Sequence, residues 1–136
     1  MNEILISTER ALLDLDAVHA FLRRSDWAKH RTRETVEATF ETSLCFGAYS
    51  GRRQVGFARV VTDYCTFAYL CDVFVDEEFR GRGISRCLMD AVVAHPRLQK
   101  LRRFVLSTSS AHGLYKKYGF GEVPPNRFME IKNEQV

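Results

Sequence analysis

Residues 73–85 have the sequence VFVDEEFRGRGIS, in which an apolar run gives way to charged residues and then to two glycines. Apolar residues then recur at helical spacing, at Ile84, Cys87, Leu88, Ala91 and Val92. The stretch therefore joins a strand to a helix. Backbone N–H groups at the start of a helix lack partners within it, and the helix dipole adds positive potential there. The sequence predicts an anion site formed by Arg80, Gly81, Arg82, Gly83, Ile84 and Ser85.

This loop differs from two common nucleotide-binding motifs. No Lys-Ser or Lys-Thr pair follows its second glycine, as a P-loop requires, and Arg86 stands where the third glycine of GxGxxG would lie. The alternative is a plain glycine turn with solvated arginines. The charge of residues 80–103 favours a polyphosphate ligand, because they include only one acidic residue. The basic residues of this segment are Arg80, Arg82, Arg86, Arg97, Lys100, Arg102 and Arg103.

Length and composition predict a single globular domain over residues 1–136. Hydrophobic residues make up 46% of the chain and charged residues 27%, a balance that is typical of chains with a buried core. The formal net charge of +3 is too small to indicate a nucleic-acid or membrane partner. No run of about 18 apolar residues is present, and no basic stretch precedes an apolar run at the N-terminus. We expect neither partner, and a cytoplasmic location.

The cysteines predict free thiols rather than a metal site. They form no C-x-x-C pair and show no ligand-like spacing to the histidines. Reduced cysteines pack as small hydrophobic residues, which fits a reducing compartment. We therefore expect no bound metal. The four cysteines are Cys45, Cys65, Cys71 and Cys87.

The apolar pattern predicts a mixed α/β fold. Helices are expected near residues 15–22, 32–40, 84–94 and 109–118. Strands are expected over 2–7, 44–49, 54–62, 66–75 and 104–108, with two last candidates at 120–123 and 127–132. The strand at 66–75 is apolar almost throughout, which is typical of a central strand covered on both faces. Asp72 is the exception in that strand.

Two blocks of the sequence resemble the GNAT superfamily of acyl-CoA-dependent N-acetyltransferases. The first block, RGRGIS at residues 80–85, matches the family signature (Q/R)xxGx(G/A) except at Ser85, where glycine or alanine is usual. The second block, AHGLYKKYGF at residues 111–120, is similar to the family's AxxLYxxxGF helix. The two blocks occur in the family's order with a strand between them, and the resemblance extends over about residues 2–132.

The resemblance implies a fold and a co-substrate. The fold would be a mixed, mostly antiparallel sheet of about six to seven strands flanked by about four helices. A V-shaped opening would lie between the strands at residues 70–75 and 104–108 and would admit acetyl-CoA. The backbone amides of residues 82–85 would hold the pyrophosphate, and Phe74 and Val75 would hydrogen-bond the pantetheine arm. Thr108 departs from the family pattern, because many members have asparagine there.

Tyr115 is the candidate proton donor that the resemblance implies. A phenol, with a reference pKa near ~10, is protonated at neutral pH and can reprotonate or hydrogen-bond a departing thiolate. It would therefore also contact the co-substrate. The alternative is that Leu114, Tyr115 and Tyr118 form a packing face of their helix.

Asp72 is the candidate base, because an acid within an apolar strand can accept a proton or bind a cationic amine. The alternative is an aspartate satisfied by hydrogen bonds or by a buried partner. Cys71 could carry an acyl group, but a buried thiol of ordinary pKa is a poor nucleophile. We therefore expect direct attack by the amine in a ternary complex.

The expected function is acetyl transfer from acetyl-CoA to a primary amine of a small molecule. One alternative is a peptide or protein amine as acceptor, and another is a module that binds or senses acyl-CoA without catalysis. A nucleic-acid binder that uses the basic segment 80–103 is the third reading, and it lacks a matching motif. The last strand could also pair with a second copy of the chain, which would give a homodimer.

Overall fold

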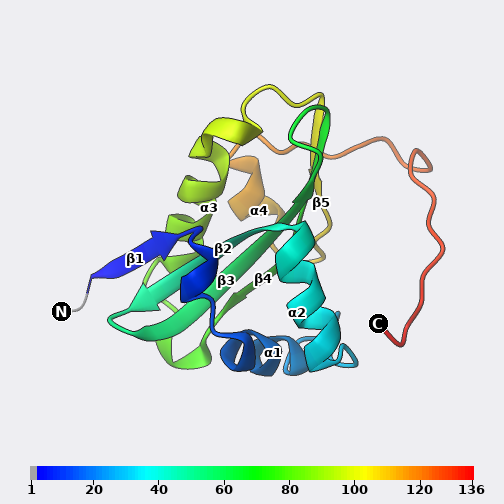
Figure 1. The fold of residues 1–136 in the computed structure, drawn as a ribbon. Helices are drawn as coiled ribbons and strands as arrows, with labels where there is room; N and C mark the ends of the chain where they lie inside the picture. The colour runs from blue at the N-terminus through cyan, green and yellow to red at the C-terminus, as the bar shows by residue number, and fades with distance from the viewer. Residues whose placement is uncertain (1–2) are drawn as a thin grey trace.

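The protein, analysed as a computed structural model that describes residues 3–136, has one five-stranded sheet (Figure 1). The strands lie side by side in their sequence order. The first four pair antiparallel, and the last two pair parallel. The strands are β1 (Ile4–Ser7), β2 (Leu44–Ser50), β3 (Arg53–Thr62), β4 (Phe67–Val75) and β5 (Arg103–Leu106).

Helices cover both faces of the sheet (Figure 1). The helices α1 (Leu15–Arg23) and α2 (Arg33–Thr42) bury Val18, Phe21, Val36 and Phe40 in a core on one face. The helix α3 (Ile84–Ala94) packs on the other face, close to the short helix α4 (His112–Lys116). Three 3-10 turns complete the helical segments: η1 (Arg10–Leu12), η2 (Glu77–Phe79) and η3 (Pro96–Leu98). The four predicted helices are confirmed.

Two polar side chains explain where the first two helices begin. Asp14 accepts a hydrogen bond from the backbone N–H of Ala17 at 3.0 Å, and Thr32 accepts one from Thr35 at 3.1 Å. Each side chain satisfies an N–H group that has no partner within its helix. The helices that begin at these caps, α1 and α2, pack on the half of the sheet that contains Phe57 and Phe74.

Strand β4 contains a bulge that changes which way its backbone points. Arg59 of β3 pairs with Cys71, and Phe57 pairs with Phe74, so Asp72 and Val73 together oppose one residue of β3. Asp72 has a φ of 54°, in the left-handed region that few non-glycine residues adopt. The extra residue reverses the alternation of the strand beyond this point.

The predicted opening between β4 and β5 is present. The two strands pair from Phe67 and Arg103 only as far as Leu70 and Leu106, where β5 ends. Strand β4 continues to Val75. Its last five residues therefore have no neighbouring strand on the β5 side within the described part of the chain.

The prediction of six to seven strands is wrong, because residues 3–136 form five. Residues 120–123 and 127–132 are not strands. Residues 121–136, here called the C-terminal arm, instead leave the body and arch away from the sheet (Figure 1). A strand requires a hydrogen-bonding neighbour, and the arm has none within the described chain. The alternation of apolar and charged residues in these two segments indicates a preference for extended backbone. It does not show whether a partner strand is present.

Candidate active site

A cavity of about 590 Å³ opens where β4 ends and α3 begins. Its volume is within the range of small-molecule sites. It is lined by seven of the predicted cofactor-binding residues, which are Phe74, Val75, Arg80, Gly81, Gly83, Ile84 and Ser85. Arg82 and Tyr115 are not among the residues that line it. Val73, Arg24 and Trp27 line it as well, and none of the three was among the predicted cofactor-binding residues.

The two glycines give the cavity an open backbone wall. Gly81 and Gly83 have φ angles of 79° and 80°, a conformation that other residues rarely adopt. A Cβ atom at either position would meet nothing within 4 Å, so the surface above both residues is free. Gly83 is also the N-cap of α3, where no side chain caps the helix. The first N–H groups of α3 are therefore accessible to an anion.

Arg80 is held at the mouth of the cavity. Its Nε donates to the carbonyl oxygen of Val75 at 3.2 Å, and its guanidinium lies 5.2 Å from the centre of the Phe74 ring. Arg82 instead lies over the ring of Phe79, at 4.8 Å. The two predicted arginines thus have different positions, and only Arg80 lines the cavity.

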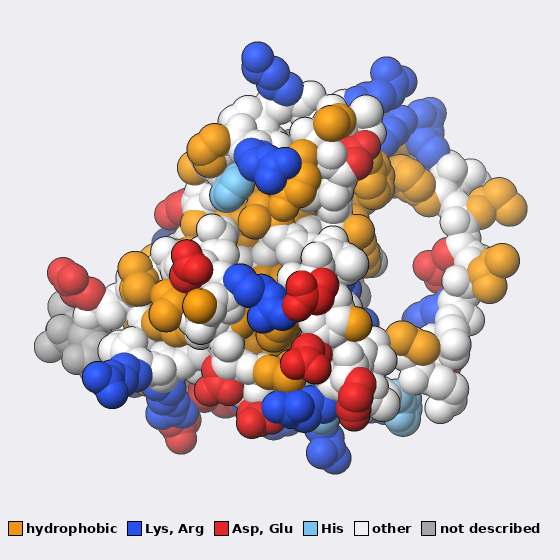
Figure 2. All heavy atoms as spheres, viewed as in Figure 1, with side chains coloured by type: hydrophobic (Ala, Val, Ile, Leu, Met, Phe, Trp, Pro, Cys, Tyr) orange, Lys and Arg blue, Asp and Glu red, His pale blue; other side chains and the backbone are white. Residues whose placement is uncertain are grey.

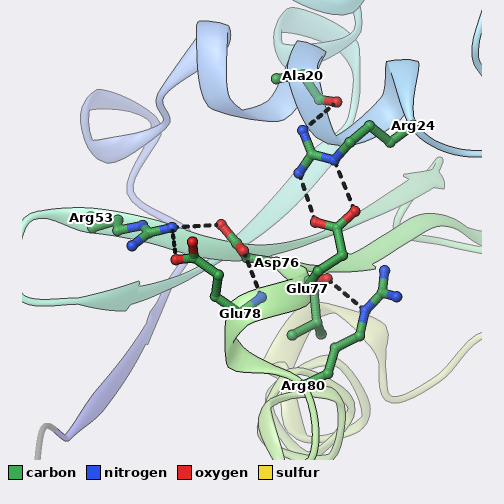
Figure 3. Close-up of polar contacts among 8 residues, drawn as sticks. Ala20, Arg24, Arg53, Asp76, Glu77, Glu78 and Arg80 are labelled. Atoms are coloured by element: carbon green, nitrogen blue, oxygen red, sulfur yellow. Dashed lines mark hydrogen bonds and ion pairs between the residues drawn. The ribbon is translucent and has the colours of Figure 1, made fainter.

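Arg24, the residue that follows helix α1, also lines the cavity. Figure 3 shows its guanidinium facing the carboxylate of Glu77. Its Nε and Nη2 donate to the carboxylate of Glu77 at 2.9 and 3.0 Å. The hydrogen bonds from Arg24 lower the pKa of Glu77 below its ordinary value. The guanidinium also lies 5.5 Å from the Phe74 ring centre. The two ion-pair partners are far apart in sequence and carry no shared motif, so sequence reasoning could not pair them.

The bulge directs two backbone amides of β4 toward the opening. The N–H of Asp76 donates to Val55 of β3 at 2.8 Å, so Val75 and Val73, which alternate with it, face the opposite side. The backbone of Phe74 faces β3, where it pairs with Phe57. The ring of Phe74 lines the cavity and stacks on Phe21, with 5.2 Å between the ring centres. The backbone amides that face the opening are those of Val73 and Val75.

Asp72 is 4% exposed and accepts three hydrogen bonds. Its Oδ1 accepts from Trp27 at 3.0 Å, and its Oδ2 accepts from Arg31 at 2.7 Å and from Arg59 at 2.8 Å. This arrangement matches the alternative reading of a buried, satisfied aspartate. The indole N–H and two guanidinium groups converge on this one carboxylate, which ties the bulge of β4 to β3 and to the segment after α1.

We expect Asp72→Ala to destabilise the protein by about 3 kcal/mol, because the change leaves Arg31 and Arg59 buried without their shared partner. For a chain of this size, that loss lowers the melting temperature by roughly 10 °C. Thermal unfolding followed by circular dichroism measures it. Asp16→Ala is the control, because Asp16 forms an exposed ion pair with Arg33 and should change stability by less than about 1 kcal/mol. An Asp72→Ala variant as stable as this control would contradict the structural role.

Tyr115 does not line the first cavity. Leu114 lines the first cavity, and Tyr115 lines a second one of about 1070 Å³ together with Thr108 and His112. Burial raises the pKa of Tyr115 above its ordinary value, so the phenol is protonated at neutral pH. Its ring meets Phe120 edge to face at 6.1 Å.

The Tyr118 hydroxyl and the Cys71 thiol have different environments. The hydroxyl of Tyr118 donates to Asp90 at 2.9 Å on the outside of α3, which fits a structural role. Burial raises the pKa of the Cys71 thiol to about 11, so very little thiolate exists at neutral pH.

Among residues 3–136, no three histidine, cysteine, aspartate or glutamate side chains gather in a way that could hold a metal ion. No helix in this part of the chain is both long and apolar enough to cross a membrane.

Comparisons with known proteins identify the family of this chain. Residues 41–122 match the family model of an acetyltransferase (GNAT) domain. A Gibberella zeae protein named as an acetyltransferase is 31% identical, and the match covers 87% of this chain and 79% of that protein.

Solved structures extend the agreement to the whole fold. A GNAT-family protein of Xanthomonas campestris pv. campestris is 51% identical, with a TM-score of 0.95 over 100% of this chain and 97% of that one. The ribosomal-protein-S18-alanine N-acetyltransferase of Escherichia coli is 22% identical, with a TM-score of 0.73 over 90% of this chain and 80% of that one, and shares the fold alone. From the family model and these relatives we conclude that this chain belongs to the GNAT acetyltransferase family.

Proposed function

We propose that this chain transfers an acetyl group from acetyl-CoA to a primary amine of a small molecule. The observation that carries the proposal is the meeting of two backbone donor sets at one cavity. The N-terminus of α3, opened by Gly81 and Gly83, lies on one side. The amides of Val73 and Val75 lie on the other, beyond the end of β5. A ligand with both a pyrophosphate and an extended amide-bearing arm fits this pair of donors.

The residues present fit the phosphate end of acetyl-CoA. The open backbone at residues 81–85 and the dipole of the eleven-residue helix α3 would hold the pyrophosphate. Arg80 and Arg24 line the same cavity and add positive charge. Ser85 is small and lines the cavity too, so its replacement of glycine or alanine leaves the site open. Arg82, which packs on Phe79, would contribute its backbone amide rather than its side chain.

The pantetheine arm would pair with β4 in the manner of an added strand. Val73 and Val75 offer outward amides there, and Phe74 offers the face of its ring. This proposal moves one of the expected contacts from the backbone of Phe74 to that of Val73. The Val75 carbonyl already accepts from Arg80, so the Val75 N–H is its available group.

The chain's own groups can then serve the chemistry of transfer. Acetyl-CoA supplies the thioester carbonyl and the thiol leaving group. The outward N–H of Val73, at the bulge, is the candidate donor to the carbonyl oxygen, where negative charge develops during attack. Tyr115, protonated at neutral pH, is the candidate donor of a proton to the departing thiolate sulfur, and the proton that the attacking amine nitrogen loses would pass to solvent. Asp72 acts as a positioning residue, since it holds the bulge that turns Val73 outward.

Direct attack by the amine is favoured over an acyl-cysteine route. Cys71 precedes Asp72 on β4 and is the only cysteine of that strand. Burial raises the pKa of its thiol to about 11. A thiol with so little thiolate at neutral pH is a poor nucleophile. The amine acceptor would instead approach the thioester directly from the side of the second cavity, where Tyr115 lies.

Thiol release tests the proposed function. Purified protein is mixed with acetyl-CoA and a panel of primary amines that includes small metabolites and short peptides, and free thiol is measured with a chromogenic disulfide. We expect release above the amine-free control with at least one small amine, and a product heavier by one acetyl group. Release with peptides alone would favour a peptide acceptor. Binding of acetyl-CoA without release for any amine would indicate a non-catalytic binding module.

A further inference from the structure

Two arginines of this protein share one carboxylate beside the bulge of β4. Arg31 and Arg59, here called the arginine pair, both donate to Oδ2 of Asp72, at 2.7 and 2.8 Å. Among residues 3–136, neither arginine forms an ion pair with a second acidic side chain. Guanidinium groups stay protonated in proteins. Since two of them meet one carboxylate here, the cluster has a surplus of one positive charge.

The surplus charge is partly withdrawn from water. The side chains of Arg31 and Arg59 are each only 13% exposed. On the outer surface over α1 and α2, by contrast, basic and acidic side chains are interspersed (Figure 2). A charge with little access to water and no counter-charge costs free energy unless an anion pairs with it. Trp27 and one arginine would already give each oxygen of Asp72 a donor, so the second arginine exceeds what the bulge requires.

The arginine pair also has N–H groups that Asp72 does not use. Arg31 binds Asp72 through Nη1 and Arg59 binds it through Nε, while Nη1 of Arg59 donates to Ser43 at 3.0 Å. In the part of the chain that the structure describes, the other guanidinium nitrogens donate to no group, and the Tyr49 hydroxyl is the only buried side-chain polar atom without a partner. These nitrogens therefore reach solvent. Two neighbouring guanidinium groups with accessible N–H groups are suited to binding carboxylate or phosphate oxygens.

The arginine pair lies next to the proposed place of acetyl transfer. Asp72 directly precedes Val73, whose N–H is the candidate donor to the thioester carbonyl oxygen. Arg59 pairs with Cys71 across β3 and β4, and Tyr69 lies two residues farther along β4 on the same face. Tyr69 is 37% exposed and lines the second cavity, the side from which the amine would approach. An acceptor that enters from this side would therefore lie beside the arginine pair.

We propose that the acceptor amine carries an acidic group, a carboxylate or a phosphate, and that Arg31 and Arg59 bind this group while the amine attacks the thioester. The inference rests on the proposed acetyl transfer and names the class of its acceptor. The bound acid supplies the counter-charge that the arginine pair lacks, and it orients the amine toward the thioester carbon. The surplus positive charge also disfavours diamines and other polycations, because like charges repel.

The acidic group takes no part in the bonds that change. The amine nitrogen forms a bond to the acetyl carbon, and the carbon–sulfur bond of the thioester breaks. The departing sulfur takes a proton from Tyr115, and the proton that the nitrogen loses passes to solvent. The arginine pair thus acts through binding and orientation, so its effect belongs mainly in KM for the acceptor.

Matched series of acceptors test the proposal on the wild-type protein. One series is the ω-amino acids of increasing chain length, and the others are the neutral amides of the same acids, the phosphate esters of ω-amino alcohols, and diamines. Thiol release from acetyl-CoA gives kcat/KM for each compound at constant ionic strength. At the best chain length, we expect one acidic series to exceed the neutral amide by about tenfold or more, with diamines the poorest acceptors. Amides or diamines that react as fast as both acidic series would overturn the proposal and leave the proposed acetyl transfer intact.

Arg31→Gln tests the arginine pair itself. This change removes the surplus charge and leaves Asp72 with its donors from Arg59 and Trp27. We expect the preference for the acid over the amide to fall by about tenfold through a higher KM for the acid, while kcat/KM for the amide stays within about twofold. Arg31→Lys keeps the charge and should restore part of the preference. An unchanged preference in folded Arg31→Gln would overturn the proposal.

Arg33→Gln is the matched control for that variant. Arg33 lies two residues farther along and forms an exposed ion pair with Asp16. Its loss removes the same charge from the chain and should leave the preference for the acid unchanged. Circular dichroism checks that each variant folds. If Arg31→Gln does not fold, the comparison of acids with amides in the wild type decides alone.

Trp27 fluorescence separates this proposal from the proposed function. Trp27 is the only tryptophan of the chain and donates to Oδ1 of Asp72 at 3.0 Å, so an acid bound to the arginine pair changes its surroundings. The probes are butanoate, propyl phosphate and neutral butanamide, which lack an amine and can be titrated with acetyl-CoA present. We expect a saturable change with at least one of the two acids, none with butanamide, and none with either acid in Arg31→Gln.

The two readouts fail in different ways. If neither acid gives a saturable change, the proposal is overturned even where amines are acetylated. A saturable change with an acid, in a protein that releases thiol with no amine, would support the acid site and contradict the proposed acetyl transfer.

Discussion

Tyr115→Phe should lower kcat about 100-fold while leaving the affinity for acetyl-CoA within about twofold of the wild type. The change removes one hydroxyl and keeps the ring, whose edge-to-face contact with Phe120 is preserved. Burial raises the pKa of Tyr115, so the wild-type phenol is a proton donor throughout the neutral pH range. The measurement is steady-state thiol release with the best amine of the panel, with acetyl-CoA affinity determined separately by calorimetry.

Tyr118→Phe is the matched control for that variant. Tyr118 lies one turn farther along the chain, and its hydroxyl donates to Asp90 on the outside of α3. Its loss should leave kcat within a few-fold of the wild type. Equal kcat values for the two variants would contradict the role given to Tyr115, and a loss of acetyl-CoA affinity with Tyr115→Phe would move that role from proton transfer to binding.

Gly83→Glu should weaken acetyl-CoA binding by roughly 100-fold or more, which corresponds to about 2.7 kcal/mol. The space above Gly83 is free within 4 Å and faces the predicted pyrophosphate position, so the new side chain would place a carboxylate where phosphates must lie. Electrostatic repulsion and loss of room act in the same direction. Calorimetric titration of the folded variant with acetyl-CoA measures the change.

Gly51→Glu controls for the backbone strain in that experiment. Gly51 also has a positive φ, 58°, and its Cβ would likewise meet nothing within 4 Å, but it lies in the turn between β2 and β3. Both substitutions impose a similar backbone cost of about 1 to 2 kcal/mol on folding. We expect only Gly83→Glu to lose affinity. Equal losses in the two variants would place the phosphate site elsewhere.

The sequence predicted those parts of the candidate site that are built from residues close together in the chain. The strand, loop and helix around residues 73–85 lie within one short stretch, so their order could be predicted along with the open glycines. The V-shaped opening was expected from the resemblance to the family, and the pairing of β4 with β5 ends at Leu70 and Leu106 as that resemblance implies. Val73 was missed because a bulge reverses the alternation of β4, and periodicity alone does not show a bulge.

Long-range contacts account for the other differences. The residues that bind Asp72, which are Trp27, Arg31 and Arg59, come from other parts of the chain, so the sequence could not show which groups hold this carboxylate. Arg24 reaches the cavity for the same reason. The segments 120–123 and 127–132 have the composition of strands, but the described chain offers them no neighbour.

The most direct test of the account is the melting temperature of the wild-type protein with and without acetyl-CoA. A ligand present at about 100 times its dissociation constant stabilises the folded state by about 2.7 kcal/mol, which for 136 residues raises the melting temperature by roughly 10 °C. We predict that rise for acetyl-CoA. An unchanged melting temperature at saturating acetyl-CoA, in a protein whose folding is confirmed by circular dichroism, would contradict the assignment of this cavity to acetyl-CoA.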